Sequence, residues 1–398
     1  MSTIRDKFDP AFTGLPDVKF ADYVRAIEKE GVAPMSWADA FYPDPCLPPH
    51  IIDAVKEALD KGRTHYTMPI GDQELRQEIA RKAKTVNGID ADPDTEIIIT
   101  PGSDTGLYHA MRPFIVPGDE VLIPDPSYTN NFINVRLMGA TPVSVELKEE
   151  NGFQLDIADM ETRLSDKTKM IVLTHPNNPT TTVFSRESLK QLSEFAVRHD
   201  LVVVVDQVFE GSIFDEREFI SLATLPGMWE RTVTVCSTSK SMSLCGFRVA
   251  YNIACEEIMR VMHASSVYIL GATNTFAQAG ALAALRDDAF VEEFNRVFDQ
   301  RRQSAYEVFN SIPGVHCLMP EATFLIWVNT SQLGSSDEVS RLLRTQARVQ
   351  VTPGSHYGEF GEGSLRFNVA QLNEEKFLQT LDDIKTTLTK RAEELGIH

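Results

Sequence analysis

The chain has 398 residues, of which 42% are hydrophobic, and a formal net charge of −19. That length and apolar content can bury a large core and predict two domains. The acidic charge argues against nucleic acids and anionic membrane surfaces as partners, because both are bound by basic patches.

Cysteine usage and the N-terminal residues bear on location. The five cysteines are dispersed and form neither CxxC pairs nor Cys/His clusters, so we expect no metal site. Dispersed, unpaired thiols are typical of a reducing compartment. No apolar run approaches membrane-spanning length, and the N-terminus lacks the apolar core of a signal peptide. We therefore expect a cytoplasmic protein without a membrane segment.

The first elements along the chain are an arm and two helices. The arm spans residues 1–49 and ends at two prolines, and helical apolar spacing follows at 51–61 and 73–84. Strands and helices then alternate, and residues 201–205 are apolar on both faces, as in a buried central strand. This order predicts an α/β fold with a mostly parallel, doubly wound sheet. The expected strands are 96–100, 120–124, 141–147, 170–175, 201–207, 232–236 and 249–254.

The last third of the chain has a different pattern. A long amphipathic helix begins near residue 287, and strand patterns follow at 323–328 and 364–369. We expect a large, cofactor-binding domain over residues 50–290 and a smaller α+β domain over 291–398. The arm, residues 1–49, is expected to join the smaller domain.

The segment from Ser237 to Arg248 is the most informative motif. Lys240 leaves an apolar strand among small hydroxyl residues, and a Gly-x-Arg sequence follows. A lysine amine can condense with an aldehyde cofactor, while Ser237 and Arg248 can hold a phosphate. The alternative is a surface lysine in a polar loop, which is the commoner state of lysine. The segment closely resembles the pyridoxal-phosphate attachment signature of the class I/II aminotransferases.

This resemblance implies a fold type I enzyme with pyridoxal 5′-phosphate held by Lys240 as a Schiff base. Ligands of open α/β sheets bind at the carboxyl ends of strands, and Asp206 ends the valine-rich strand. In the family, the matching aspartate pairs with the pyridine nitrogen and keeps it protonated. Without the resemblance, Asp206 would be read as a structural carboxylate that caps the next element.

Two further turns match the family at the cofactor. Residues 100–106 link a strand to a helix, and free N–H groups at a helix start favour a phosphate. Such turns are common, so the resemblance assigns Ser103, Asp104 and Thr105 as backbone or side-chain donors. Tyr128 follows another strand and matches the aromatic residue that stacks on the cofactor ring. Taken alone, an aromatic residue in a turn is more often simple packing.

Substrate-binding residues are also implied. The loop at residues 175–180 resembles the family's Asn-Pro-x-x-Pro-Thr-Gly-like loop, in which the residue matching Asn178 bonds the cofactor's phenolic oxygen and shapes the carboxylate pocket. Thr181 stands where the family usually has glycine. Arg366 lies on a late strand, and a guanidinium is the natural bidentate clamp for an α-carboxylate. A lone arginine is more often a surface residue, so this role rests on the resemblance.

One motif implies a second subunit. Tyr66 begins a stretch that matches the family's Tyr-x-x-x-x-Gly-x-x-x-Leu-Arg element, with Leu75 and Arg76 at its end. In the family this tyrosine reaches the phosphate of the neighbouring subunit's cofactor. The resemblance therefore implies a homodimer with composite active sites.

The chain departs from the family at two places. Phe209 stands where a tyrosine usually donates to the cofactor's phenolic oxygen and lowers the pKa of the cofactor-bound lysine. The aromatic segment from Trp37 to Tyr42 stands where family members often have a glycine-rich turn. It either lines the substrate entrance or packs the arm onto the domain.

The expected reaction is transamination from an amino acid to a 2-oxo acid by a ping-pong cycle. Lys240 would shuttle the proton as general base and acid, while Asp206 supports the ring nitrogen. Because a fold does not fix a reaction, a carbon–sulfur β-lyase, an oxidase or a racemase is an alternative. A non-catalytic cofactor-binding regulator is a third hypothesis. The sequence leaves the amino donor and the pathway open.

Overall fold

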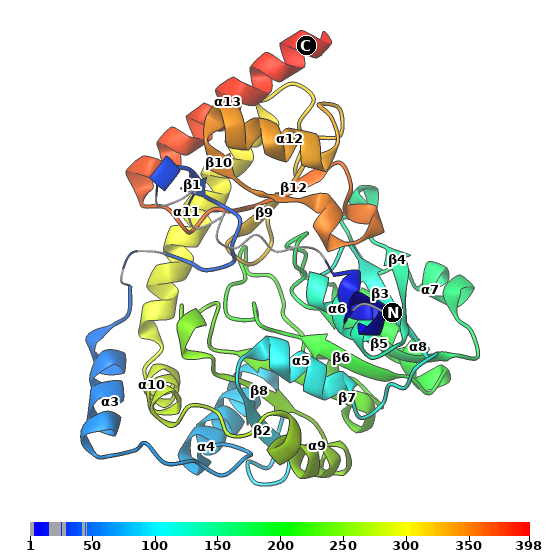
Figure 1. Cartoon of the computed structure of the whole chain (residues 1–398), viewed down its shortest axis with the longest axis vertical. Coiled ribbons are helices and arrows are strands. Elements are labelled where there is room, and N and C mark those ends of the chain that lie inside the picture. Colours follow the sequence, from blue (N-terminus) through cyan, green and yellow to red (C-terminus); the bar gives the residue numbers. More distant parts are fainter. Residues whose placement is uncertain (1–3, 16–24, 26–28, 42–43, 45) are drawn as a thin grey trace.

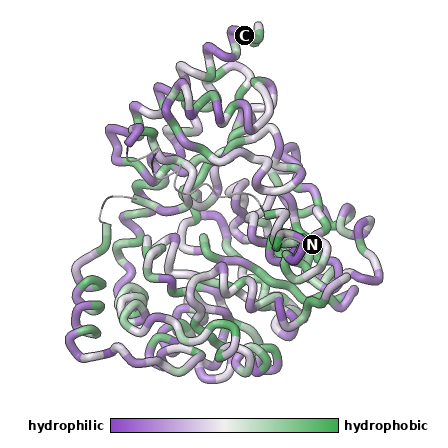
Figure 2. Tube along the Cα trace, viewed as in Figure 1, coloured by the Kyte–Doolittle hydropathy of each residue, from purple (hydrophilic) through white to green (hydrophobic). Residues whose placement is uncertain are grey.

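The computed structural model describes residues 4–15, 25, 29–41, 44 and 46–398. Two lobes are visible in Figure 1, a larger one around the main sheet and a smaller one that carries the C-terminus. Hydrophobic stretches follow the strands of the main sheet, while hydrophilic residues lie along the outer helices (Figure 2). None of the described helices combines the length and apolar character needed to cross a bilayer.

The larger lobe contains a seven-stranded sheet in the order β2-β8-β7-β6-β5-β3-β4. Every neighbouring pair is parallel except the two that involve β8, which runs antiparallel to both β2 and β7. The expectation of a mostly parallel sheet is therefore confirmed. Its strands are β2 (Ile97–Thr100), β3 (Glu120–Asp125), β4 (Thr141–Glu146), β5 (Thr168–Thr174), β6 (Val202–Asp206), β7 (Thr232–Ser237) and β8 (Ala250–Ile253).

Helices cover both faces of this sheet. Val203 and Val205 of β6 pack on one face with the core that includes Leu192 of α8, whereas Val204 packs on the other with Leu107 of α5. This alternation explains why the valine run is apolar at every position. The helices of the larger lobe are α3 (Pro49–Asp60), α4 (Gln73–Lys82), α5 (Ser103–Met111), α6 (Thr129–Leu137), α7 (Ile157–Arg163), α8 (Arg186–Arg198), α9 (Glu256–Ile269) and α10 (Thr275–Arg286).

Helix α4 is shorter than the predicted helix 73–84. It ends at Lys82 and continues as a π-helical turn, Ala83–Asn87, which Gly88 closes with a φ of 72°. The wider turn keeps Asn87 buried, and Gly88 supplies the left-handed conformation that ends the segment.

The smaller lobe is built on an antiparallel sheet in the order β11-β12-β9. The arm contributes β1 (Ala33–Pro34), which pairs in parallel with β10 (Val349–Gln350), so this part of the arm joins the smaller lobe. The short helix α1 (Pro10–Thr13) of the arm instead contacts α6 of the larger lobe (Figure 1). The remaining elements of the smaller lobe are β9 (Leu325–Asn329), β11 (Thr352–Pro353), β12 (Ser364–Asn368), α11 (Ala289–Asn310), α12 (Ser336–Leu342) and α13 (Glu374–Leu395).

Candidate active site

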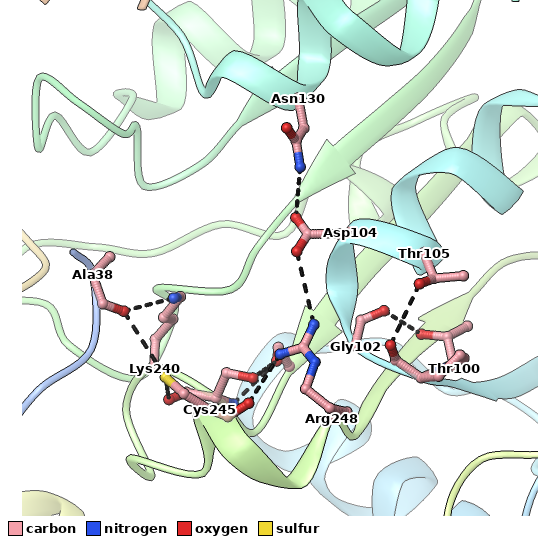
Figure 3. Close-up of polar contacts among 12 residues, drawn as sticks. Ala38, Thr100, Gly102, Asp104, Thr105, Asn130, Lys240, Cys245 and Arg248 are labelled. Atoms are coloured by element: carbon pink, nitrogen blue, oxygen red, sulfur yellow. Dashed lines mark hydrogen bonds and ion pairs between the residues drawn. The ribbon is translucent and has the colours of Figure 1, made fainter. Parts of the chain in front are cut away.

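The predicted site residues gather where strands of the large sheet end and the small lobe begins. The loop after β7 carries Lys240, whose Nζ donates to the carbonyl oxygen of Ala38 at 2.7 Å (Figure 3). At the end of β7, the hydroxyl of Ser237 accepts from the backbone N–H of Ser239 at 3.0 Å. The amine is thus half-buried and held between the β7 loop and the N-terminal arm.

Asp206 is the last residue of β6 and is almost fully buried. Its Oδ1 accepts from the backbone N–H of Val208 at 3.2 Å. Burial raises the pKa of Asp206 to about 7, because the Val208 N–H and the Lys240 charge only partly offset the desolvation of the carboxylate. A carboxylate in this position is stabilised by a cation or a strong donor placed next to it.

The turn between β2 and α5 packs tightly against Arg248. Gly102 has a φ of 90°, a backbone conformation that favours glycine, and a Cβ built on it would lie 2.0 Å from Nη2 of Arg248, so a side chain there would displace the guanidinium. The guanidinium also donates to the carbonyl oxygen of Cys245 at 2.9 Å. Helix α5 begins at Ser103, and its first N–H groups lie at the same turn. A guanidinium beside a helix N-terminus is a suitable site for an anion.

The side chain of Asp104 accepts hydrogen bonds. The hydroxyl of Tyr128 donates to its Oδ1 at 2.8 Å. Nδ2 of Asn130 also donates to Oδ1 at 2.8 Å, and Nη2 of Arg248 lies 3.7 Å from Oδ2 (Figure 3). Burial, and then the Asp104 charge, raise the pKa of Tyr128. The sequence predicted that Asp104 donates to the phosphate through its backbone or its side chain. Because the side chain accepts hydrogen bonds, only the backbone N–H can be the donor. The neighbouring Thr105 hydroxyl donates to the carbonyl oxygen of Pro101 at 3.4 Å.

Arg366 and Asn178 meet although they are far apart in the sequence. Nη1 of Arg366, on β12, donates to Oδ1 of Asn178 at 3.0 Å, and Nη2 donates to the carbonyl oxygen of Ser36. The guanidinium carbon lies 4.9 Å from the centre of the Tyr357 ring. Nε of Arg366 is buried and has no hydrogen-bond partner among the described residues. The guanidinium therefore keeps donor capacity for a ligand.

The aromatic segment of the arm has two different roles. Its backbone faces the site, because Nδ2 of Asn368 donates to the carbonyl oxygens of Trp37 and Asp39. Its Phe41 ring packs instead into the core, 4.7 Å from the ring of Phe294. The packing interpretation thus holds for Phe41, while the lining of the substrate entrance stays a prediction. Tyr42 lies outside the described residues.

The structure also describes Phe209 and Thr181, two residues that depart from the family pattern. Phe209 is fully buried, and its ring meets Phe324 edge-on at 5.6 Å. Thr181 has a φ of 65°, so it adopts the left-handed backbone for which glycine is the usual residue. Threonine in this backbone conformation introduces local strain.

Tyr66 is not brought to the site within one chain. It is 93% exposed and lines a surface depression with residues 272–276. The backbone there is tied together by Thr275, whose hydroxyl donates to the carbonyl oxygen of His65 at 2.7 Å.

Some site groups have no signature in the sequence. Asn130 lies two residues after the Tyr128 motif, and its proximity to that motif is its only signal. Asn368 is likewise two residues from Arg366. Backbone carbonyls such as that of Ala38 cannot be found from residue type at all.

The donor set fits pyridoxal 5′-phosphate. Arg248 and the α5 N-terminus suit a phosphate, and the buried Asp206 suits a protonated ring nitrogen. Lys240 offers an amine for the aldehyde. Among the described residues, no cluster of three His, Cys, Asp or Glu side chains is arranged to hold a metal ion.

The sequence profile of the family described as aminotransferase class I and II matches residues 34–384. The chain belongs to this family. It is 37% identical to aromatic-amino-acid aminotransferase 2 of Thermococcus litoralis and 36% identical to an aspartate aminotransferase of Pyrococcus abyssi, covering 88% of this chain and 90% of each relative. The solved aromatic aminotransferase of Pyrococcus horikoshii superposes with a TM-score of 0.87 at 34% identity, covering 94% of this chain and 99% of that one.

This class I/II aminotransferase has the fold type I architecture of its structural neighbours. It is a pyridoxal-phosphate-dependent enzyme that transfers amino groups between amino acids and 2-oxo acids. The family, fold, cofactor and reaction predicted from the Lys240 motif are therefore confirmed.

Proposed function

We propose that Lys240 and Asp206 are the catalytic residues of this aminotransferase, and that Arg366 and Asn178 bind the substrate carboxylate. The observation that carries this proposal is the buried Asp206 carboxylate, whose pKa is raised to about 7 and is sensitive to the charge of Lys240. A carboxylate and an amine coupled inside a protein are groups with distinct acid–base tasks.

Each residue has a definite task. Pyridoxal 5′-phosphate, when bound, supplies an aldehyde and an electron-withdrawing ring. Nζ of Lys240 takes the proton from the substrate Cα and later returns one. Asp206 holds the proton on the ring nitrogen. The guanidinium of Arg366 orients the substrate, because a carboxylate carries a full charge and displaces the neutral Ser36 carbonyl from Nη2.

The remaining predicted residues hold the cofactor. Arg248 and the hydroxyls near it bind the phosphate, and the ring of Tyr128 stacks on the cofactor ring. The phosphate donors in this assignment are Ser103, Thr105, Ser237, Arg248 and the backbone N–H of Asp104.

The proposed amino donor has an aromatic or other apolar side chain. The rings of Tyr128 and Tyr357 lie beside groups assigned to the site, and such rings favour an apolar partner. The name of the Thermococcus litoralis relative agrees with this choice. An acidic donor is the second candidate, because the Pyrococcus abyssi relative is named an aspartate aminotransferase.

A half-reaction tests the proposal. Holoenzyme is mixed with single amino acids in the absence of any 2-oxo acid, and the cofactor's absorbance is followed. We expect one equivalent of 2-oxo acid per active site, fastest with phenylalanine or tyrosine. Continuous release of pyruvate and ammonia would instead identify a β-lyase. Faster reaction with aspartate would favour the acidic donor.

Arg366→Met is expected to raise the KM for the amino donor by about 10- to 150-fold, the loss of one charge-assisted pair of roughly 1.5–3 kcal/mol. The cofactor should still bind, because Arg366 is not assigned to it. Steady-state kinetics with one donor measure this effect. Arg301→Met is the control, since Arg301 is equally buried and donates to the carbonyl oxygen of Val369. Equal KM changes in both variants would contradict the assignment.

Phe209→Tyr is expected to lower the pKa seen in a spectral titration of the bound cofactor. The added hydroxyl can donate to the cofactor's phenolic oxygen and so stabilises the unprotonated form of the linkage to Lys240. Phe294→Tyr, in the same aromatic cluster, adds an equal hydroxyl as a control. An unchanged pKa in Phe209→Tyr would reject the role inferred for this position.

We also propose a cytoplasmic homodimer, in which Tyr66 reaches the neighbouring site. Tyr66, Met68 and Tyr268 are large side chains at least two-thirds exposed in the single chain, which is unusual for a free surface. Light scattering should give a dimer, and Tyr268→Glu should shift it toward monomer with loss of activity. Leu395→Glu, on α13 far from this face, should change neither (Figure 1). A fully active monomer would refute the dimer proposal.

The five cysteines are unpaired in the structure, which supports a reducing compartment. We further propose the domain division made above: the arm at 1–49, the large domain at 50–290 and the small domain at 291–398.

A further inference from the structure

A buried ion pair lies behind the site, and neither of its residues has a task in the proposed reaction. Nζ of Lys82, the last residue of α4, contacts Oε1 of Glu210 in the turn after β6. The second carboxylate oxygen, Oε2, accepts from Nδ2 of Asn87. Nζ also donates to Oδ1 of Asn87 at 3.3 Å. Three side chains from two distant segments therefore form a closed set of hydrogen bonds.

Strands β7 and β8 of the large sheet cover the ion pair. Sγ of Cys236, on β7, lies 3.9 Å from Oε2 of Glu210, and the ring centre of Tyr251, on β8, lies 6.0 Å from Nζ of Lys82. Burial raises the pKa of both Cys236 and Tyr251, so both stay neutral. Burial alone would lower the pKa of Lys82, but the Glu210 carboxylate holds it above its ordinary value. The cluster thus has one cation facing one anion.

The turn that carries Glu210 connects two groups assigned to the reaction. It begins directly after Asp206, and the backbone N–H of Gln207 donates to the carbonyl oxygen of Val235 at 2.7 Å. A Cβ built on Gly211 would lie 2.7 Å from both Cβ and Oγ of Ser241. Ser241 is the residue after Lys240. The turn 207–211 therefore starts at Asp206 and ends in direct contact with the Lys240 loop.

We propose that Lys82 and Asn87 are positioning residues that act through Glu210 and hold the turn 207–211 against Ser241. This fixes Lys240 relative to Asp206 without any contact to substrate. The inference rests on the proposed function of Lys240 and Asp206. Its physical basis is that an uncompensated Glu210 carboxylate would pull its turn toward water.

Lys82→Met tests the proposal by two independent readouts on full-length holoenzyme. The half-reaction rate constant at saturating amino donor should fall about 10- to 100-fold, the effect of a small misplacement of reacting groups. The KM should stay within about twofold, because Arg366 is untouched. Hydrogen–deuterium exchange should become faster in residues 207–212 and in 237–244. Lys82→Arg keeps the charge and should restore both readouts.

Arg76→Met is the matched control for stability. Arg76 is also buried on α4, but its guanidinium bonds the Pro93 carbonyl and Asp94, at 2.9 Å, instead of the 207–211 turn. Losing it should lower the melting temperature without changing the rate constant or the exchange of residues 237–244. Asn87→Ala removes no charge and should lower the rate constant and speed the exchange less than Lys82→Met does. If Lys82→Met does not fold, Asn87→Ala tests the proposal in its place.

One outcome would contradict the positioning role of Lys82 and Asn87. If Lys82→Met or Asn87→Ala lowers only the melting temperature, as Arg76→Met does, the network is structural and the proposal fails. If wild-type enzyme shows no half-reaction, the proposed function fails instead, while the exchange of residues 237–244 still tests positioning.

Discussion

Lys240→Ala is expected to lower the rate of the amino-donor half-reaction by up to about 10⁴-fold, the upper range for a positioned acid–base group. No other amine is assigned to the substrate Cα, so no described side chain takes over the task. The fold should persist, because the lysine gives up one hydrogen bond, to the Ala38 carbonyl, of roughly 1 kcal/mol. Stopped-flow absorbance and the yield of 2-oxo acid measure the effect.

Cys245→Ala is the control for disturbing the same loop. Sγ of Cys245 lies 3.0 Å from the carbonyl oxygen of Ser239, so its removal alters the packing around Lys240 while leaving the amine. This variant should stay within a few-fold of wild type. If Lys240→Ala also stays within tenfold of wild type, another group moves the proton and the assignment is wrong.

The sequence predicted those parts of the site that follow general rules. Parallel strands ending in Asp206, Tyr128 and the Lys240 loop place these residues at one edge of the sheet. The turn at residues 100–106 was expected to link a strand to a helix start, and α5 begins there at Ser103. Position along the chain placed these residues together, while their roles came from the family resemblance.

The sequence could not predict contacts made by backbone groups or by distant segments. The carbonyls of Ser36 and Ala38 contact Arg366 and Lys240, yet a carbonyl carries no residue signature. Lys82 and Glu210 are 128 positions apart, and neither lies in a recognised motif. The antiparallel direction of β8 is hidden for a similar reason, since apolar spacing reveals a strand and not its direction.

Asp206→Asn is expected to have opposite effects on activity and on stability. Its half-reaction should slow by roughly 10²- to 10⁴-fold, because an amide cannot hold the ring nitrogen protonated, and losing one member of a buried pair costs about 3–5 kcal/mol. Without cofactor, however, the native carboxylate is buried and its pKa is raised from 3.8 to about 7. The ionised Asp206 side chain therefore destabilises the cofactor-free fold.

The direction of the Asp206 pKa shift determines the pH range in which this residue changes the stability of the fold. Between about pH 4 and pH 7 the folded chain binds the Asp206 proton more tightly than the unfolded chain does, so this group's contribution to stability falls as pH rises. Asparagine does not ionise, so cofactor-free Asp206→Asn should become the more stable protein above pH 7, by at most about 4 kcal/mol. Denaturant unfolding of both cofactor-free proteins at pH 5 and pH 8 measures the difference.

Asp125 supplies the contrast that makes this test specific. It is also fully buried, and burial raises its pKa too, but its carboxylate accepts from the Ser144 hydroxyl at 2.7 Å and from the backbone N–H of Glu359 at 2.9 Å, bonds that counteract the shift. Asp125→Asn breaks these bonds at both pH values, and their loss should outweigh what is gained by removing the charge. A gain confined to Asp206→Asn and to the higher pH would mean that the fold holds Asp206 at a cost that cofactor binding offsets. Equal pH dependence of wild type and Asp206→Asn would mean that the carboxylate is already paired without the cofactor.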